Sequence, residues 1–323
     1  MSMRNIFKPL VFLSILLSIF LAGCVVIGLP RTQPLKEKTI GGSGAAKVLV
    51  MDISGIISED EPGGSILQEK PRITARVKEE LDKAAEDSAI KALILRINTP
   101  GGSVTSCDII SHEIKAFKKN KNIPVVAELM DTAASGGYYI ASSGDMIIAH
   151  PTTVTGSIGV ISYSVNASGL LEKIGIADQT IKSGDKKDIG TMLRPMTEEE
   201  RAILQSVIDS MYDRFLDVVV EGRRGLIPKD ELRKIADGRV LTAGQALSLK
   251  LIDSIGYMDD AIEAAKKLSG VKEARIITYA PPSAYRNNIY SGVPQMPSQL
   301  NLINIDPGLS RKFGTSFMYI WMP

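Results

Sequence analysis

The stretch Val125-Val-Ala-Glu-Leu-Met-Asp-Thr-Ala-Ala-Ser-Gly-Gly-Tyr-Tyr139 joins an apolar run to a short helical pattern through a turn of small residues. The apolar run predicts a buried strand, and residues 138–143 predict the helix. Ser135 in the turn is then exposed, and its amide and that of Gly136 lie near the positive end of the helix. This geometry suits attack on a carbonyl group and stabilisation of the resulting oxyanion. The structural alternative is an N-cap serine followed by glycines that allow tight packing.

The same strand–turn–helix pattern occurs one unit earlier in the chain. Residues 92–97 predict a strand, 98–102 a glycine-rich turn and 103–119 a helix, and another strand is expected at 146–149. Strands that alternate with helices of this length indicate parallel units joined by crossovers. Both glycine-rich turns follow their strands, and such turns meet at the sheet edge where α/β proteins assemble sites. The sequence therefore predicts an α/β fold.

Four segments are expected along the chain. Residues 1–30 form a signal anchor or lipoprotein signal, 31–46 a flexible linker, 47–275 the folded body and 276–323 an irregular tail with an apolar tip. In the body, a strand is expected at 47–53, and residues 179–189 are expected to be a strand leading into a basic loop. Helices are expected at 73–86, 166–173, 197–222, 231–236, 243–249 and 258–268. The helix from Thr197 starts with the capping box Thr-Glu-Glu-Glu.

The N-terminal segment predicts attachment to a membrane. Residues 10–29 are apolar or small throughout, which is long enough to span a bilayer, and Arg4 and Lys8 precede them. Positive charge on that side predicts that the N-terminus stays cytoplasmic and the body is exported. Leu21-Ala-Gly-Cys24 resembles a bacterial lipobox with Cys24 as the lipidated residue, whereas the apolar residues after it favour an uncleaved transmembrane anchor. In both cases the body lies on the extracytoplasmic side of a bacterial membrane.

The composition excludes several classes of protein. The chain has 323 residues, of which 44% are hydrophobic, enough for a sizeable core. A net charge of +2, the lack of long Lys/Arg runs and an aromatic content of 5% argue against a nucleic-acid partner. The two cysteines, Cys24 and Cys107, provide no disulfide framework, and Cys107 is expected to be a small buried side chain.

A catalytic serine needs a base, and histidine is the usual one. The chain has two histidines, His112 within a predicted helix and His150 before a proline, and neither has the setting of a catalytic residue. The scarcity of histidine favours a lysine as the base. A lysine serves as a base when its pKa falls from about 10.4 to about 7–8, through burial and neighbouring cations.

Three lysines, Lys182, Lys186 and Lys187, bracket a tight Ser-Gly turn after an apolar segment, which can bring them over the sheet edge. The carboxylate of Asp188 would raise the pKa of a neighbouring lysine, so we expect it to point away from the site. A second oxyanion donor is expected in Thr99-Pro-Gly-Gly102, where Gly102 at the helix start is favoured; the alternative is a plain turn.

Four motifs occur in register: Asn98-Thr-Pro-Gly-Gly-Ser103, Ala133-Ala-Ser-Gly-Gly-Tyr138, Thr155-Gly-Ser-Ile-Gly-Val160 and Ile181-Lys-Ser-Gly-Asp-Lys-Lys-Asp188. Over residues 47–270 the chain resembles the short bacterial signal peptide peptidases (SppA), which are Ser/Lys peptidases of the ClpP/crotonase superfamily. The resemblance implies a fold of ClpP/crotonase-like stacked ββα units.

The resemblance also implies residue roles. Ser135 matches the nucleophile, Lys187 rather than Lys186 the general base, Ser157 the serine that orients the lysine amine, and Gly102 the oxyanion glycine. Gly136 as the second oxyanion donor is our inference from the turn itself.

The implied protein is a membrane-anchored serine endopeptidase that needs no cofactor or metal and degrades remnant signal peptides and other apolar peptides. Because the chain carries one copy of a domain that the long form of the family duplicates, a homo-oligomer is expected. An apolar substrate is expected to add as a strand along a groove, and the tip 319–323 is a candidate to enter that groove itself. Two alternatives remain open: a crotonase-type acyl-CoA enzyme and a non-catalytic membrane scaffold.

Overall fold

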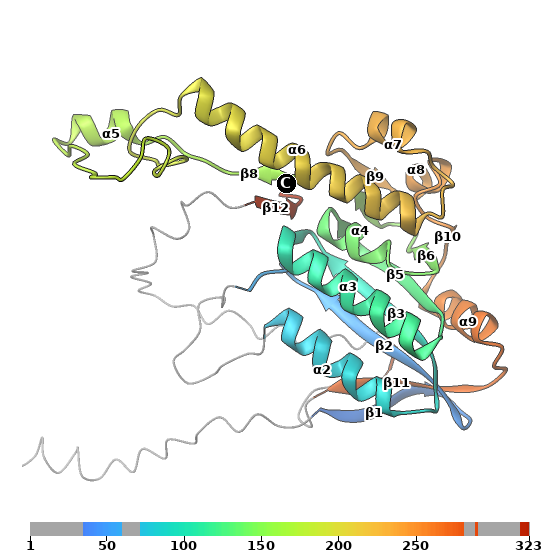
Figure 1. The fold of residues 1–323 in the computed structure, drawn as a ribbon. Coiled ribbons are helices and arrows are strands. Elements are labelled where there is room, and N and C mark those ends of the chain that lie inside the picture. Colours follow the sequence, from blue (N-terminus) through green and yellow to red (C-terminus); the bar gives the residue numbers. More distant parts are fainter. Residues whose placement is uncertain (1–34, 60–71, 281–287, 290–316, 323) are drawn as a thin grey trace, which may run out of the picture. The chain divides into compact units, whose positions relative to one another are not determined.

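The computed structural model of the chain describes residues 35–59, 72–280, 288–289 and 317–322, all of which belong to one compact unit (Figure 1). The described strands are β1 Lys36–Gly42, β2 Ala46–Ser54, β3 Ile90–Thr99, β4 Gly101–Ser103, β5 Val125–Ala134, β6 Met146–Ala149, β7 Val154–Gly156, β8 Ile161–Ser162, β9 Val240–Thr242, β10 Ser254–Ile255, β11 Ala274–Ala280 and β12 Phe317–Ile320. The described helices are α2 Ile73–Glu86, α3 Val104–Lys121, α4 Gly136–Ala141, α5 Ser168–Lys173, α6 Glu198–Gly222, α7 Lys229–Ile235, α8 Ala243–Ser248 and α9 Met258–Ser269.

One large, mostly parallel sheet organises these elements. Its strand order is β1-β11-β2-β3-β5-β6-β10, with β7 beside the end of β5 and β9 beside β7. The pairs from β11 through β10 and the β5–β7 pair are parallel, whereas β1 and β9 join antiparallel. A second, three-stranded sheet has the order β4-β12-β8. The chain thus has the mixed α/β fold with a large parallel sheet that the alternating pattern predicts.

The two faces of the large sheet bury separate cores. Along β2, Leu49, Met51 and Ile53 face one cluster, and Val48 and Val50 face the other. Helices α2, α3 and α4 cover the first face, and α9 covers the second (Figure 1). Because a strand buried on both faces favours apolar residues on both sides, β2 and β3 contain the apolar runs 48–51 and 92–95, and the buried Asp52 and Arg96 that follow them pair with each other at 2.6 Å.

Most predicted elements form where the apolar spacing places them. The helix expected at 73–86 is α2, and the capping box of Thr197 is present, with its side chain accepting from the amide of Glu200. The following helix, α6, ends at Gly222. These signals are local, so the sequence alone contains them.

The structure corrects three of the expectations. Part of the predicted linker 31–46 is strand β1, which pairs with β11, so the folded body begins before residue 47. The predicted irregular tail 276–323 contains most of β11 and all of β12. No strand forms at 179–189, because that segment has no strand beside it, and Ile181 is 98% exposed.

The predicted anchor lies outside the described residues, as does Cys24. Among the residues that the structure does describe, none of the helices combines the length and the apolar character needed to cross a membrane.

One buried carboxyl group stands out in the core beneath α9. Glu128 of β5 is fully buried, and neither carboxyl oxygen has a hydrogen-bond partner among the described residues. Burial, with a smaller contribution from the charge of Asp260 on α9, raises the pKa of Glu128 to about 8.

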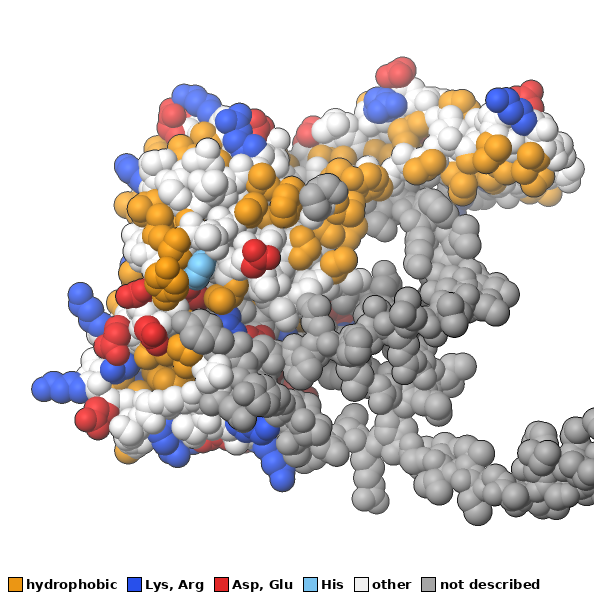
Figure 2. Space-filling view, turned by 180° about the vertical axis from the view of Figure 1, so that it is seen from behind, with side chains coloured by type: hydrophobic (Ala, Val, Ile, Leu, Met, Phe, Trp, Pro, Cys, Tyr) orange, Lys and Arg blue, Asp and Glu red, His pale blue; other side chains and the backbone are white. Residues whose placement is uncertain are grey.

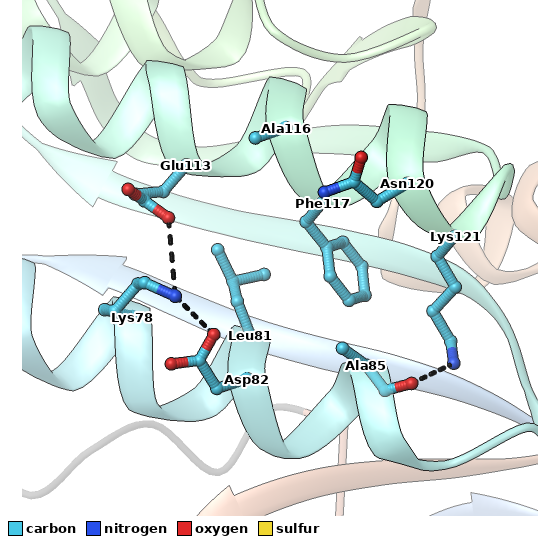
Figure 3. Close-up of a pocket in the computed structure, with 9 residues that line it drawn as sticks. All are labelled: Lys78, Leu81, Asp82, Ala85, Glu113, Ala116, Phe117, Asn120 and Lys121. Carbon is cyan, nitrogen blue, oxygen red and sulfur yellow. Dashed lines mark hydrogen bonds and ion pairs between the residues drawn. The ribbon is translucent and has the colours of Figure 1, made fainter.

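A hollow of about 220 Å³ lies between α2 and α3 (Figure 3). Phe117 and Leu81 form its apolar part, and Lys78 bridges Asp82 and Glu113 at its rim. Its lining comes from residues 78–85 of α2 and 113–121 of α3. These segments lie toward the amino ends of the parallel strands, so the hollow is separate from the glycine-rich turns at the opposite edge.

Candidate active site

Ser135 occupies a strained turn between β5 and α4. Its backbone has φ 52° and ψ −112°, a conformation that residues other than glycine rarely adopt. The residue is 1% exposed, although the sequence predicts an exposed serine. Its amide donates to the carbonyl of Gly156 over 2.8 Å. Although Ser135 stands at the N-cap position of α4, its side chain makes no capping hydrogen bond. The structural alternative of a capping serine therefore does not apply, and the hydroxyl is available for another role.

The glycine-rich turn after β3 forms the short strand β4 beside Ser135. Gly101 has φ +103°, and its amide donates to Oγ1 of Thr99 over 3.0 Å. Ile57 is hydrogen-bonded to this strand on both sides of Gly102: its amide donates to the carbonyl of Gly101, and its carbonyl accepts from the amide of Ser103. A Cβ atom on Gly102 would lie 1.9 Å from the carbonyl oxygen of Ile57. Only glycine fits at this position.

Strand β12 from the end of the chain lies between β4 and β8. Tyr319 is opposite Gly102 in the antiparallel pair with β4, and Phe317 is opposite Ser162 of β8. The amide of Trp321 donates to the carbonyl of Pro100 over 2.8 Å. Because hydrogen-bonded pairs alternate in an antiparallel ladder, the next such pair is Tyr319 with Gly102. The amide of Gly102 therefore faces the carbonyl of Tyr319. Tyr319 and Ile320 of the tip thus pair with β4, Pro323 lies outside the described residues, and entry of the tip into a substrate groove stays a prediction.

The carbonyl oxygen of Tyr319 lies between the two glycine-rich turns. A Cβ atom on Gly101 would be 1.9 Å from this oxygen and 2.7 Å from the amide nitrogen of Gly136. A Cβ atom on Gly136 would be 3.0 Å from the same oxygen. The structure thus brings Gly102 and Gly136 close to one carbonyl group beside the turn of Ser135, and their role as oxyanion donors stays a prediction.

Ser157 also lies near this slot. Gly156 pairs with Ala134 and accepts the amide of Ser135, so the next residue, Ser157, lies beside the turn. Ser157 is 6% exposed, has φ 50°, and donates its amide to the carbonyl of Arg239 over 2.7 Å. Ser157 therefore follows directly on the residue that accepts the Ser135 amide, and its expected role of orienting the lysine amine stays a prediction.

Lys187 is not brought to Ser135 within this chain. It is exposed on the segment between β8 and α6, which extends away from the large sheet (Figure 1). Among the described residues no hydrogen bond or ion pair involves its amine. Its neighbours are engaged: Lys182 pairs with Asp188 at 2.7 Å, and Lys186 pairs with Glu199 at 2.5 Å.

These ion pairs distinguish the three candidate lysines. The hydrogen bond with Glu199 raises the pKa of Lys186. Its amine therefore stays protonated and cannot accept a proton from a serine hydroxyl. Asp188 is held by Arg194 and Lys182, whose hydrogen bonds lower the pKa of its carboxyl group. As expected, the carboxylate of Asp188 is directed to partners other than Lys187.

The histidines and Cys107 are placed as the sequence analysis expects. His112 is exposed on α3, and Nδ1 of His150 contacts Oγ1 of Thr152 at 2.9 Å. Cys107 is a free, fully buried thiol whose pKa is raised by burial. It packs under the turn, since a Cβ atom on Gly136 would meet its Sγ at 2.4 Å.

An aromatic pocket next to the slot is not foreseen in the sequence. The ring of Tyr319 stacks on Tyr139 of α4 and packs against Phe215 of α6, with ring centroids 5.0 and 4.7 Å apart. The hydroxyl of Tyr139 donates to Asp108, which also accepts from Arg214. Burial opposes ionisation of Asp108, but these two hydrogen bonds hold its pKa below the usual value. The adjacent tyrosines after the Ser-Gly-Gly turn are the one sequence signal for this pocket.

Comparison with known proteins places this geometry in a family. Residues 117–272 match the model of peptidase family S49. The chain is 37% identical to "Putative signal peptide peptidase SppA" of Enterococcus faecium, over 77% of this chain and 71% of that protein. It is 32% identical to "Serine protease SPPA, chloroplastic" of Arabidopsis thaliana, over 80% of this chain and 38% of that protein. "Protease 4" of Haemophilus influenzae is 33% identical over 69% of this chain and 35% of its own length. The chain therefore belongs to peptidase family S49 and is a serine peptidase.

Proposed function

We propose that this chain is a membrane-anchored serine endopeptidase that degrades remnant signal peptides and other apolar peptides after protein export. The observation that carries the proposal is the position of β12. Strand β12, an extended peptide, lies between β4 and β8, and the carbonyl of its Tyr319 lies near Gly102 and Gly136, beside the turn of Ser135. This is the arrangement that a peptide substrate needs before hydrolysis.

In the proposed mechanism Ser135 attacks the carbonyl carbon of the scissile bond while the uncharged amine of Lys187 accepts the hydroxyl proton. The amides of Gly102 and Gly136 stabilise the negative charge that develops on the carbonyl oxygen. The protonated amine then gives the proton to the leaving nitrogen, and the C–N bond breaks. A water molecule hydrolyses the acyl-enzyme by the same route in reverse, which releases the acid and restores Ser135.

The other roles follow from position. Ser157, next to the turn of Ser135, would orient the lysine amine by a hydrogen bond. The apolar N-terminal segment would hold the enzyme in a bacterial membrane with the catalytic body on the extracytoplasmic side. The name of the Enterococcus faecium relative and the aromatic side chains packed around Tyr319 both support apolar peptides as substrates. Membership of a peptidase family favours this function over an acyl-CoA enzyme or a scaffold.

The test is hydrolysis by the full-length chain in detergent micelles. An apolar fluorogenic peptide is offered to the wild type, Ser135→Ala and Lys187→Ala, with Lys186→Ala as the matched control. We expect both dyad variants to lose at least about 1,000-fold in kcat and the control to retain most of its activity. Cleavage at an undiminished rate in Ser135→Ala or Lys187→Ala would refute the dyad.

A further inference from the structure

An arginine on the segment before α6 joins two carboxylates. The Nε and Nη2 groups of Arg194 donate to the two oxygens of Asp188 over 3.0 and 2.8 Å. Its Nη1 and Nη2 groups donate to the two oxygens of Glu200 over 2.9 and 2.6 Å, and Nη1 also donates to the carbonyl of Pro195 over 3.2 Å. All the N–H groups of the guanidinium therefore have acceptors, and no other side chain supplies this set of donors.

Both carboxylates are largely enclosed. The side chain of Glu200 is 2% exposed, and that of Asp188 is 12% exposed. Glu200 belongs to the capping box of α6, and its carboxylate also accepts from the amide of Thr197 over 2.9 Å. The hydrogen bonds from Arg194 and from this amide lower the pKa of Glu200 to about 2, so the carboxylate stays ionised at neutral pH. Arg194 therefore attaches Asp188 to the first turn of a long helix.

The attached residue, Asp188, directly follows Lys187, the candidate base. Apolar packing within the chain does not hold the preceding stretch, because residues 172–185 are all exposed. The turn has local backbone bonds, among them the amide of Lys187 to the carbonyl of Gly184 over 3.0 Å. A second link to α6, between Lys186 and Glu199, is solvent-exposed, and exposed ion pairs restrain the chain little. The enclosed link through Arg194 is therefore the stronger restraint on this turn.

We propose, on the basis of the peptidase function above, that Arg194 is a positioning residue for the reaction and acts on Lys187 through Asp188. It fixes the backbone of Lys187 relative to α6, so that the amine meets the serine hydroxyl in one defined geometry. Such control matters because a displacement of about 1 Å in a reacting group can cost about 100-fold in rate. The segment extends away from the large sheet, so its shape has to be set within the segment itself (Figure 1).

Arg194 also engages carboxylates that would otherwise be free to pair with the amine. It binds Asp188 and Glu200. A carboxylate close to a lysine raises the pKa of that lysine, and Asp188 is the sequence neighbour of Lys187. Loss of Arg194 should therefore displace the amine and also keep it protonated to higher pH. The charged side chains between residues 182 and 200, apart from Lys187, are Lys182, Asp185, Lys186, Asp188, Arg194, Glu198, Glu199 and Glu200.

The test compares full-length Arg194→Lys with full-length Arg223→Lys in hydrolysis of the apolar fluorogenic peptide. Arg223 is the matched control, because it makes the same kind of two-pronged contact at the other end of α6. Its Nη1 and Nη2 groups donate to the carboxylate of Asp253 over 2.9 and 2.7 Å. Lysine keeps the charge in both variants and loses the paired donors. We measure kcat and KM across the pH range in which a lysine base titrates.

Arg194→Lys should lower kcat by about 10–100-fold and change KM by less than about threefold, because the contacts with the peptide remain. The midpoint of the rise of kcat with pH should move up by about one pH unit, because the amine is easier to protonate. Arg223→Lys should keep the wild-type midpoint. A midpoint does not depend on the amount of folded enzyme, so a loss of stability does not produce the shift.

A double variant tests whether Arg194 acts through Asp188. Asp188→Asn and Arg194→Lys break the same link, so Asp188→Asn/Arg194→Lys should be no slower than the slower single variant at the pH of its maximum rate. Losses that multiply would show that the two residues act independently, which would overturn the proposed route.

The other negative outcomes separate this role from the peptidase function. A wild-type midpoint in Arg194→Lys, with or without a fall in kcat, would overturn the positioning role and leave the peptidase function standing. Undiminished hydrolysis in Lys187→Ala would overturn the proposed dyad, and the role of Arg194 with it.

Discussion

At the scale of single residues, Ser135 combines backbone strain with a side chain that makes no capping hydrogen bond. Its φ of 52° and ψ of −112° are readily adopted only by glycine, and holding another residue there costs about 1–3 kcal/mol. The strain is explained if the turn exists to direct the side chain into the slot. Such a residue contributes to function at the expense of stability.

The strain predicts that Ser135→Gly is more stable than Ser135→Ala by about 1 kcal/mol, because only glycine relieves it. Neither variant loses a capping hydrogen bond, since the serine side chain makes none. Thermal unfolding of both full-length variants in the same detergent measures the difference, and hydrolysis should be absent in both. Equal midpoints would show that the turn is not strained.

Glu128 predicts how stability depends on pH. Burial raises its pKa from 4.5 to about 8, so the folded protein holds a proton that the unfolded chain releases. This contribution to stability is complete below pH 4.5 and is lost as the pH rises toward 8. From pH 5 to pH 8 we expect Glu128 to account for a loss of about 2–4 kcal/mol in unfolding free energy.

The measurement is unfolding of Glu128→Gln and of Glu172→Gln, an exposed acid on α5, in urea at pH 5 and pH 8. The first variant should lose the Glu128 contribution to the pH dependence, and the second should behave like the wild type. The same slope in both variants would show that Glu128 does not titrate as its burial implies.

At the scale of elements, the sequence predicts what depends on local pattern. The bounds of α2 and the capping box of α6 follow from apolar spacing and from Thr197 with Glu200. Strand β1 escapes prediction because Lys-Glu-Lys-Thr-Ile-Gly-Gly lacks a strand pattern and gains its structure from β11, far along the chain. The strand expected at the start of residues 179–189 does not form, because only Thr180 and Ile181 favour a strand and no described strand lies beside them.

In the candidate site too, residues in local motifs can be predicted from the sequence, whereas contacts between distant segments cannot. Ser135, Gly102 and Ser157 lie in short motifs whose turns bring them to one sheet edge, so the sequence predicts their neighbourhood. The aromatic pocket depends on α6 passing over α4 and on β12 returning from the end of the chain. Neither contact is encoded locally, so no motif predicts that Phe215 and Tyr139 share a pocket.

At the scale of the whole molecule, the segment between β8 and α6 leads us to predict that another copy of the chain completes the site. This segment carries Lys187 and extends away from the large sheet (Figure 1). It exposes a series of large apolar side chains, and Figure 2 shows hydrophobic side chains gathered along it. These are Tyr163, Val165, Leu170, Ile174, Ile176 and Ile181, which are between 51% and 98% exposed.

An apolar surface of this kind is typical of an interface. We therefore predict that the segment packs on a second copy and places Lys187 beside the partner's Ser135. Burial in that interface would also favour the uncharged amine that a base requires. The prediction explains why Lys187 forms no ion pair among the described residues while Lys182 and Lys186 do.

Complementation between inactive variants tests this arrangement. In a co-expressed equal mixture of Ser135→Ala and Lys187→Ala, a site is intact when its serine comes from one variant and its lysine from the other. Random assembly in a closed ring makes this true of about one quarter of the sites, so about 25% of wild-type hydrolysis should return. Native mass spectrometry confirms that both variants share one assembly, and each variant alone is the control. A mixed assembly as inactive as its components would mean that serine and lysine must come from the same chain.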